Sequence, residues 1–225
     1  MDFPPGSFTK QDENPDADFY AYERLVTHID DPAIAAVGEA YRHFLPPNGE
    51  YLDLMSSWVS HFPDDMPIGR LVGHGMNDIE MRNNPRLSEY FLQDVNLNPV
   101  LPLEDNRFDG VVICVSAQYL TRPVEVFAEI GRVLKPGAPL IVAFSNRYFP
   151  TKAVRIWLSL DDEGHAKLLS VYTKEAGCFE PAEVYDYSPR HTFFGIPDDA
   201  DLRRRVASGE VYTDPLYVAV ARKLE

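Results

Sequence analysis

Apolar residues along this chain fall into two alternating patterns, short continuous runs and helically spaced positions. The runs predict strands at residues 51–54, 70–74, 91–94, 108–115, 139–144, 179–187 and 216–222. The helical spacing predicts helices at residues 78–90, 124–134 and 151–176. Strands that alternate with helices at such intervals are typical of βαβ units, and near-continuous apolar strands indicate a parallel sheet. The pattern therefore predicts an α/β fold, a doubly wound sheet with helices on both faces.

The residues before the first predicted strand differ in composition from the rest. Residues 1–18 contain three prolines, five acidic residues and few apolar groups, so we expect a disordered acidic tail that cannot offset its ordering entropy. In the segment 19–45 apolar residues recur at mostly helical intervals, and Asp31-Pro32 is typical of a helix start. We therefore expect two short helices there, divided at Asp31.

Length and composition are those of a single-domain globular protein. The 225 residues, 45% of them hydrophobic and 25% charged, suffice for one domain with a full core, which we place at residues 19–225. Every apolar run is far shorter than the roughly 20 residues that span a bilayer, and no apolar leader opens the sequence. We therefore expect a cytoplasmic protein that does not associate with membranes.

Charge and cysteine usage argue against several kinds of partner. The net charge of −14 disfavours nucleic acid, because the one dense basic patch, residues 203–205, adjoins the acidic stretch 198–201. Cys114 and Cys178 stand singly, without the spacing of a zinc site or of a disulfide framework. We expect no metal, and the oligomeric state stays open.

Two motifs resemble those of a known family. The segment LPLEDNRFD at residues 101–109 resembles the LPFpdxsFD motif that leads into strand four of class I (Rossmann-like) S-adenosylmethionine-dependent methyltransferases. The segment EIGRVLKPG at residues 129–137 resembles the E-x-x-R-V-L-K-P-G-G motif before strand five of the same family. Over about residues 50–222 the chain thus resembles these enzymes, in particular the type 11 group.

The resemblance implies a seven-stranded, mostly parallel sheet with an antiparallel last strand. It also implies S-adenosyl-L-methionine as cofactor, S-adenosyl-L-homocysteine as product, and in-line methyl transfer to an acceptor. It divides the domain into an N-terminal helical lid (19–48), a cofactor-binding half (50–144) and a substrate half (145–225). The acidic balance and the aromatic loop residues favour a small-molecule acceptor, whose identity the sequence leaves open.

Candidate cofactor-binding residues are carried over from the resemblance position by position. Asp53, at the end of the first predicted strand, matches an acidic residue of the family, whereas Ser56 and Ser57 stand where the family has glycines. The serines either replace the glycines in cofactor binding, with hydroxyl donors added, or cap a helix after the strand.

The second predicted strand departs from the family pattern. Gly75 stands where the family has an acidic residue that binds the ribose hydroxyls. The cofactor candidates here are Gly73, Met76 and Asn77, with Met76 packing on the adenine and Asn77 binding one hydroxyl. A plain turn into a helix is the alternative.

Further candidates follow the third and fourth predicted strands. Asp94 matches the family position that accepts a hydrogen bond from the adenine amino group, with Val95 and Asn96 beside it. An N-cap or a loop carboxylate is the alternative role. Ser116, after the fourth strand, completes the cofactor candidates on the sheet.

Substrate contacts are expected after strands four and five. In the family these positions line the space between the cofactor and the acceptor, which here points to Gln118, Tyr119, Asn146 and Arg147. For Asn146 and Arg147 an ordinary turn is the alternative.

A general base is optional, because methyl transfer from a sulfonium depends mainly on positioning. The candidates are His61, His74, Tyr119 and His165, and none has the partner spacing of a catalytic triad. No catalytic residue is therefore assigned.

The helix expected before Asp31 carries Tyr20, Arg24 and His28 at i, i+4 and i+8, on one face. As a lid, this face would bring Arg24 or His28 to the cofactor's carboxylate and Tyr20 to the substrate. A solvated helix face is the alternative.

Two other function classes stay open. A catalytically degenerate binding or regulatory protein with this fold would also lack the glycines and the ribose acid. A dinucleotide oxidoreductase is disfavoured, because no G-x-G-x-x-G follows Asp53 and such enzymes do not share the LKPG segment.

Overall fold

One seven-stranded sheet organises the computed structural model, which describes residues 3–225. The strands are β1 (Glu50–Asp53), β2 (Arg70–Gly75), β3 (Glu89–Leu92), β4 (Gly110–Cys114), β5 (Pro139–Phe144), β6 (Glu183–Asp186) and β7 (Tyr217–Arg222). They lie in the order β3-β2-β1-β4-β5-β7-β6. Neighbours from β3 to β5 pair in parallel, whereas β7 pairs antiparallel with both β5 and β6. The predicted sheet with its antiparallel last strand is therefore confirmed.

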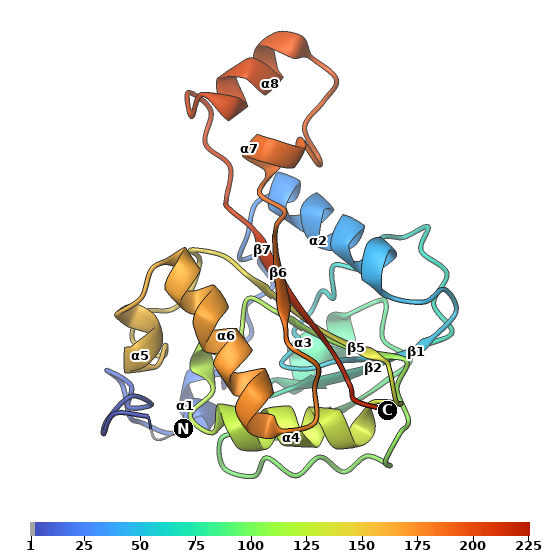
Figure 1. Ribbon diagram of the computed structural model, residues 1–225, viewed down its shortest axis with the longest axis vertical. Coiled ribbons are helices and arrows are strands. Elements are labelled where there is room, and N and C mark those ends of the chain that lie inside the picture. Colours follow the sequence, from blue (N-terminus) through green and yellow to red (C-terminus); the bar gives the residue numbers. More distant parts are fainter. Residues whose placement is uncertain (1–2) are drawn as a thin grey trace.

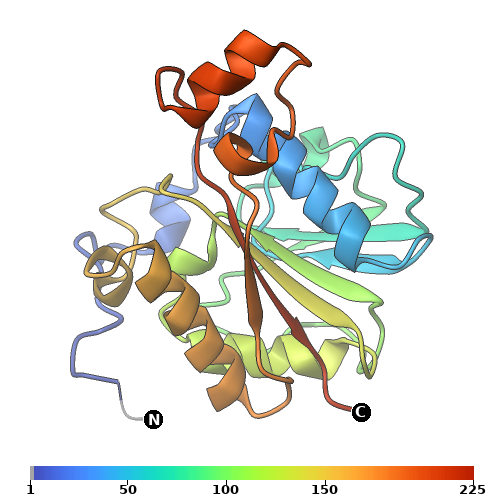
Figure 2. The ribbon, with the colours of Figure 1, turned by 45° about the horizontal axis from the view of Figure 1, so that its top comes forward.

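Helices cover both faces of the sheet (Figures 1 and 2). They are α1 (Asp16–Phe19), α2 (Asp31–Phe44), α3 (Asp78–Asn83), the 3-10 helix η1 (Ala117–Tyr119), α4 (Pro123–Val133), α5 (Arg155–Leu158), α6 (Asp162–Ala176), α7 (Pro189–Thr192) and α8 (Ala200–Ala207). Helix α2 packs on one face, and α4 and α6 pack together on the other. Helices α7 and α8 project beyond the sheet next to α2 (Figure 1).

Strand β4 shows why the apolar runs form this sheet. Val111 and Ile113 are fully buried on the face covered by α4, where Phe127 lies, and Val112 is fully buried on the opposite face with Val37 of α2. Successive side chains of a strand point to opposite faces, so a strand buried on both sides must be apolar at every position. Full burial stabilises the fold by about 1.5–3 kcal/mol for each such side chain.

The strand order reverses beside β1, which lies between β2 and β4. In doubly wound sheets a crevice opens at this point, beyond the carboxyl ends of the strands. The residues that follow β1 to β5 therefore converge on one edge of the sheet.

The amino-terminal segment is packed against the body of the protein. Phe3 and Phe8 lie with their ring centroids 6.0 and 6.2 Å from that of Tyr172 on α6, and Lys10 forms an isolated β-bridge with Val154. The prediction of a disordered tail is therefore wrong for residues 3–18, and residues 1–2 lie outside the described part.

A buried lysine explains why the acidic residues of this segment do not keep it in solution. Lys152 is 1% exposed, and its Nζ lies 3.1 and 3.3 Å from carboxylate oxygens of Asp12 and Asp16. It also donates to the backbone carbonyl of Asn14 at 2.8 Å. Judged from composition alone, these carboxylates are expected to be solvated. Composition does not show that Asp12 has a cationic partner, Lys152, 140 residues away in the chain.

The helix expected before Asp31 does not form, so that prediction is wrong. Residues 20–30, which we call the strap, run irregularly between α1 and α2. The predicted helix start is confirmed, because Asp30 accepts the backbone N–H of Ala33 at 2.9 Å and caps α2.

Further boundaries differ from the predictions. The helix expected at 78–90 ends at Asn83, and the strand expected at 179–187 is limited to Glu183–Asp186. The helix expected at 151–176 is interrupted, because Asp161 accepts the N–H of Gly164 and starts α6 anew after α5. Strand β3 lies two residues earlier than expected. The stretch expected to be irregular before residue 214 contains α7 and α8, the latter capped by Asp199.

In the described part of the chain, no helix combines the length and the apolar character needed to cross a membrane.

Candidate functional site

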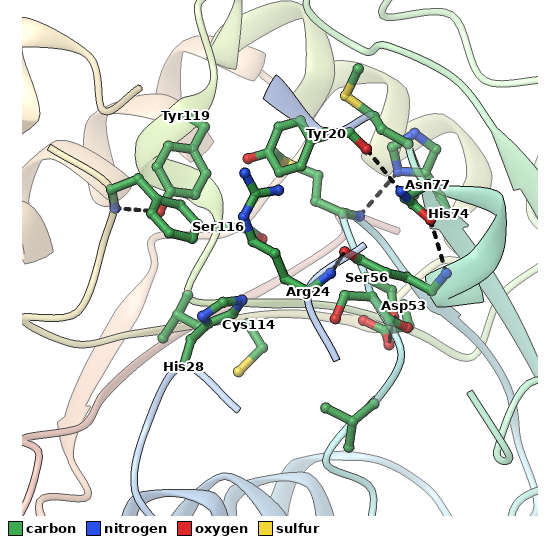
Figure 3. Close-up of a pocket in the computed structure, with 18 of the residues that line it drawn as sticks. Tyr20, Arg24, His28, Asp53, Ser56, His74, Asn77, Cys114, Ser116 and Tyr119 are labelled. Carbon is green, nitrogen blue, oxygen red and sulfur yellow. Dashed lines mark hydrogen bonds between the residues drawn. The ribbon is translucent and has the colours of Figure 1, made fainter. Parts of the chain in front are cut away.

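A cavity of about 240 Å³ lies where the carboxyl ends of β1 to β5 meet the strap (Figure 3). The predicted site residues that line it are Tyr20, Arg24, Asp53, Ser56, Ser57, Met76, Asn77, Asp94, Val95, Asn96, Ser116, Tyr119 and Arg147. Gly73, Gln118 and Asn146, also predicted for the site, are not among its lining residues. The cavity is thus where the sheet topology leads one to expect a ligand.

Asp53 ends β1 at the floor of the cavity. It is 3% exposed, and burial raises the pKa of its carboxyl to about 7. The hydroxyl of Ser56 donates to its Oδ2 at 2.5 Å, which favours the charged form and partly opposes the effect of burial. The loop after β1 therefore holds a carboxyl that changes charge near neutral pH.

His74 on β2 holds this loop in place without glycines. Its Nδ1 accepts the N–H of Met55 at 3.0 Å, and its Nε2 donates to the carbonyl of Gln93 at 2.9 Å. Burial lowers the pKa of His74 to about 4, so the neutral ring that makes both bonds is the stable form. With both nitrogens engaged, His74 positions the loop and does not fit the role of a base.

Ser56 and Ser57 stand in a segment without helix, because residues 54–69 are irregular throughout. Helix capping is thereby ruled out for them. Met55 has a φ of 59°, a left-handed conformation that glycine favours and that a side chain adopts at a cost. The loop therefore takes a glycine-like backbone path, with Ser56 and Ser57 lining the cavity.

The end of β2 leaves no room for a side chain. A Cβ at Gly75 would lie 2.5 Å from Sδ of Met81 and 3.0 Å from the carbonyl oxygen of Ser56. Gly73 lies inside the strand, where a Cβ would meet Met81 and Leu87, so it faces α3 rather than the cavity. Close packing of α3 accounts for both glycines.

Asn77 caps α3 and anchors the strap. Its side-chain oxygen accepts the N–H of Glu80 at 3.0 Å, and its Nδ2 donates to the carbonyl of Tyr20 at 2.9 Å (Figure 3). The amide that the sequence assigned to a ribose hydroxyl is therefore engaged within the protein.

Glu80, which the sequence analysis missed, lines the cavity from the first turn of α3. It is 7% exposed, burial raises the pKa of its carboxyl, and its Oε1 accepts the N–H of Arg24 at 2.7 Å. The sequence does show an acidic residue here soon after β2, but Glu80 stands five residues beyond Gly75, the position where the family has its acid.

The two carboxylate oxygens of Asp94, which follows β3, differ in their hydrogen bonds. Its Oδ1 accepts the N–H groups of Asn96 and Leu97 at 2.9 and 3.4 Å, and this leaves Oδ2 for a ligand. Residues 95–97 form a turn and no helix follows before β4, so the N-cap alternative is wrong and Asp94 is a loop carboxylate. Asn96 donates to Asp16 and to the carbonyl of Tyr119, both at 3.0 Å, so its amide ties the amino-terminal segment to the site.

The end of β4 presents a hydroxyl without a protein partner. Val115 has a φ of 42°, an outlier for a β-branched residue, and Ser116 follows it. Ser116 is 8% exposed, and among the described residues its Oγ has no hydrogen-bond partner. Gln118 instead turns back and donates to the carbonyl of Val115 at 2.7 Å.

Tyr119 and Arg147 line the cavity on the side of β4 and β5. The hydroxyl of Tyr119 accepts the N–H of Phe149 at 2.9 Å, and burial raises the pKa of Tyr119 to about 12, so it stays protonated at neutral pH. Arg147 donates from Nε to Asp214 at 2.7 Å. Asn146 is exposed and donates to the hydroxyl of Tyr212 at 3.1 Å.

Two predicted base candidates occupy contrasting places. His165 lies outside the cavity, stacked on Trp157 with centroids 4.0 Å apart and bonded through Nε2 to the Trp157 carbonyl. His61 lines the cavity, and within residues 3–225 its Nδ1 has no partner. Burial and the nearby His28 lower the pKa of His61 to about 4, so its ring is neutral. No group of three or more potential metal ligands occurs in the described part.

The strap brings Tyr20, Arg24 and His28 to the cavity without being a helix. The guanidinium of Arg24 lies 4.3 Å from the ring centroid of Phe19 and donates to the Phe19 carbonyl at 2.9 Å. The ring of His28 packs edge to face on Phe149, with centroids 5.3 Å apart. These side chains were predicted for the site on a helical spacing that the structure does not have.

Part of the chain is similar in sequence to methyltransferases. Residues 76–142 match the sequence model of the family described as "Methyltransferase domain". The malonyl-(acyl-carrier protein) O-methyltransferase of Marinomonas sp. is 29% identical over 65 residues, which are 29% of this chain and 24% of that protein. The match thus spans about a quarter of the curated relative's length.

Solved structures share the fold at low sequence identity. A chain in the complex of a methyltransferase activator with a methyltransferase from Haloferax volcanii is 18% identical, with a TM-score of 0.60 over 87% of this chain and 92% of that one. The cyclase SpnF is 17% identical, with a TM-score of 0.59 over 90% and 89%. Phosphoethanolamine N-methyltransferase 2 of Haemonchus contortus, in complex with S-adenosyl-L-methionine, is 15% identical, with a TM-score of 0.56 over 84% and 52%.

These likenesses establish the class I methyltransferase fold.

Proposed function

We propose that this chain is an S-adenosylmethionine-dependent methyltransferase that acts on a small-molecule acceptor. The observation that carries the proposal is the cavity at the carboxyl ends of the parallel strands, which collects buried carboxyls and the unpartnered hydroxyl of Ser116 next to the matched methyltransferase domain. A buried hydroxyl without a partner is costly, and a bound ligand would satisfy it.

The polar groups around the cavity fit the parts of this cofactor. We assign the free oxygen of Asp94 to the adenine amino group and the carboxylate of Glu80 to a ribose hydroxyl, because Gly75 cannot carry the family's acid. Arg24 carries the positive charge that the cofactor's carboxylate requires, and Asp53 lies where it can accept from its amino group. Ser57, Met76, Val95 and Asn96 complete the cofactor walls.

When bound, the cofactor supplies an electrophilic methyl group, so the protein needs to position the acceptor and exclude water. The strap covers the cavity, held by Asn77 and Glu80. Tyr119, Phe149 and His28 form an aromatic wall on the side of β4 and β5. Where the acceptor must lose a proton, the free Nδ1 of His61 is the group that we assign to receive it.

A second candidate function is a binding or regulatory protein that keeps the fold without catalysis. The loop after β1 lacks the family's glycines, and SpnF, named as a cyclase, has a similar fold. Fold alone therefore does not select methyl transfer.

Calorimetry with S-adenosylmethionine and S-adenosylhomocysteine tests the proposal. We expect both to bind, and Asp53→Ala to weaken binding about tenfold, the loss of one charge-assisted hydrogen bond. Asp64→Ala, which removes an exposed carboxylate, is the matched control. Failure of the folded protein to bind either compound contradicts the proposal. Transfer of a labelled methyl group to pooled small acceptors then separates an enzyme from a binding protein.

A further inference from the structure

Charge is unevenly distributed between the two halves of the cavity. Acidic side chains line the half formed by β1, β2 and β3, namely the buried Asp53 and Glu80 and the half-buried Asp94. On the half formed by β4 and β5, the lining residues within 114–119 and 147–149 are uncharged apart from Arg147. In the part of the cavity that the cofactor assignment leaves for the acceptor, Arg147 is therefore the cation that follows the strands, and the guanidinium of Arg24 on the strap lies 5.5 Å from the ring centroid of Phe149.

One hydrogen bond orients the guanidinium of Arg147 and leaves its two terminal NH₂ groups available as donors. Its Nε donates to Oδ1 of Asp214 at 2.7 Å, and the Asp214 side chain is only 2% exposed. The ring of Tyr212 lies 5.7 Å from the guanidinium carbon. Among the described residues neither terminal NH₂ group of Arg147 has a hydrogen-bond partner, and the side chain is 51% exposed. A guanidinium fixed through Nε presents both NH₂ groups as a fork that matches the two oxygens of a carboxylate or phosphate.

The nearby acidic charges do not occupy this fork. Asp214 contacts Arg147 through Nε, and its other oxygen accepts the N–H of Asp30. Asp30 in turn caps α2, where the positive end of the helix dipole offsets its charge. Arg24, the other cation of the cavity, donates to the carbonyls of Phe19 and Tyr22 on its own segment.

An apolar wall adjoins the fork. Phe149 follows Arg147 by two residues, and its ring packs against Tyr119 with centroids 6.1 Å apart and against His28 at 5.3 Å. Such rings bury a flat or apolar ligand body at little conformational cost.

We infer that the methyl acceptor is a small organic anion, whose carboxylate or phosphate group binds the NH₂ fork of Arg147 and whose apolar body packs against Phe149. This substrate class rests on the proposed function, because the inference assumes that the cofactor occupies the rest of the cavity. Arg147 is then the residue that selects anionic over neutral acceptors.

The test measures binding of three matched probes, benzoate, phenyl phosphate and benzamide, by calorimetry, with and without S-adenosylhomocysteine. In the wild type we expect at least one anion to bind about fivefold or more tightly than benzamide, as a charge-assisted pair at a half-exposed site allows. The better of the two anions identifies a carboxylate or a phosphate acceptor. Arg147→Gln should abolish the preference, and Arg147→Lys should retain part of it.

Two controls separate this role from others. Arg122→Gln removes an exposed arginine that pairs with Glu125 and should leave the anion preference unchanged. Affinity for S-adenosylhomocysteine should stay within about twofold in Arg147→Gln, because the cofactor lies on the other strands. Equal affinity for the anions and benzamide in the wild type, or a preference that survives Arg147→Gln, overturns the inference. Absence of S-adenosylhomocysteine binding contradicts the proposed function instead, and the probe comparison without it still decides the role of Arg147.

Discussion

Asp30 and Asp214, 184 residues apart in the chain, exchange two hydrogen bonds. The backbone N–H of Asp30 donates to Oδ2 of Asp214 at 3.0 Å, and the N–H of Asp214 donates to Oδ2 of Asp30 at 2.8 Å. The pair joins the end of the strap to the segment that leads into β7. Because Asp214 also accepts from Arg147, the strap and the side of the cavity that follows β5 share one anchor.

Asp214→Asn should destabilise the protein. The two oxygens of Asp214 accept from different donors, and an asparagine has one oxygen, so either Asp30 or Arg147 loses its partner in a site that is 1% exposed. We expect a loss of about 2 kcal/mol in the free energy of unfolding, reduced from the fully buried case because Arg147 is half exposed. Urea denaturation measures it. Asp198→Asn, at a carboxylate that is 94% exposed, should cost little, and equal effects of the two variants would contradict the anchor role.

The strands could be predicted from the sequence where burial dictates composition. Strands β4 and β5 are buried on both faces, so their apolar runs located them within two residues. Strand β3 is an edge strand and only partly buried, and its Glu89–Leu92 sequence carries a weaker apolar signal, which placed it two residues late. Helices α7 and α8 carry few apolar residues and were missed.

The sequence predicts which side chains lie near this edge of the sheet, but it does not predict their hydrogen-bond partners. Asp53, Asp94 and Ser116 follow strands, and the parallel topology brings strand ends together whatever the side chains do. Which groups remain free for a ligand depends on tertiary contacts. The side-chain amide of Asn77 makes hydrogen bonds with Tyr20 and Glu80. Tyr20 lies 57 residues away in the chain, so no local sequence pattern could predict that contact.

Asp53 should make stability depend on pH between about 4 and 7. Its pKa is raised from 3.8 to about 7, so the folded state binds the proton more tightly than the unfolded chain. The stabilisation is therefore fully present below pH 3.8 and is lost as the pH rises through 7. An asparagine lacks this proton, so from pH 5 to pH 7 the stability of Asp53→Asn relative to wild type should rise by about 2 kcal/mol.

Chemical denaturation at pH 5, 6 and 7 measures this difference. Asp64→Asn, at an exposed carboxylate, should follow the wild-type profile. Parallel profiles for Asp53→Asn and wild type would show that Asp53 titrates alike in the folded and unfolded states, contrary to the expectation from its burial.

Lys152→Met should release the amino-terminal segment. The substitution leaves the carboxylate of Asp12 and the carbonyl of Asn14 without their cation, next to an apolar side chain. We expect a loss of about 3 kcal/mol, as for breaking a buried ion pair, and faster proteolytic cleavage within residues 3–18. Lys167→Met, at an exposed pair with Glu163, is the control and should change neither quantity. An unchanged cleavage pattern in Lys152→Met would show that Phe3 and Phe8 suffice to hold the segment.

Asp94→Asn separates the two roles of Asp94. The amide keeps an oxygen that can accept from Asn96, so the hydrogen bond in the turn is preserved, but it replaces the other oxygen with a donor. We expect unchanged stability and an affinity for S-adenosylmethionine that falls about tenfold, because a donor cannot pair with the adenine amino group. Calorimetry and thermal denaturation measure the two effects. A loss of stability with unchanged affinity would leave Asp94 with the role of holding the turn at residues 95–97.

Arg24→Ala tests whether the strap contributes charge to cofactor binding. The backbone N–H of Arg24 still bonds to Glu80 in the variant, so the strap keeps this anchor while the guanidinium is lost. The cofactor's carboxylate then lacks its cation, and the dissociation constant for S-adenosylmethionine should rise about fivefold at low salt and less at high salt, where screening already weakens the interaction. Arg24→Lys keeps the charge, so its dissociation constant should lie between those of the wild type and Arg24→Ala.

Tyr22→Ala is the matched control for this variant, because Tyr22 lies on the same strap and is 78% exposed. It should bind S-adenosylmethionine as the wild type does at both salt concentrations. The side chain of Arg24 also donates to the carbonyl of Phe19, so a purely structural role would appear as a lower melting temperature without any salt dependence of the affinity change. Equal affinities of Arg24→Ala and wild type at low and high ionic strength would exclude the charge role, and the strap would then serve the site through packing and the exclusion of water alone.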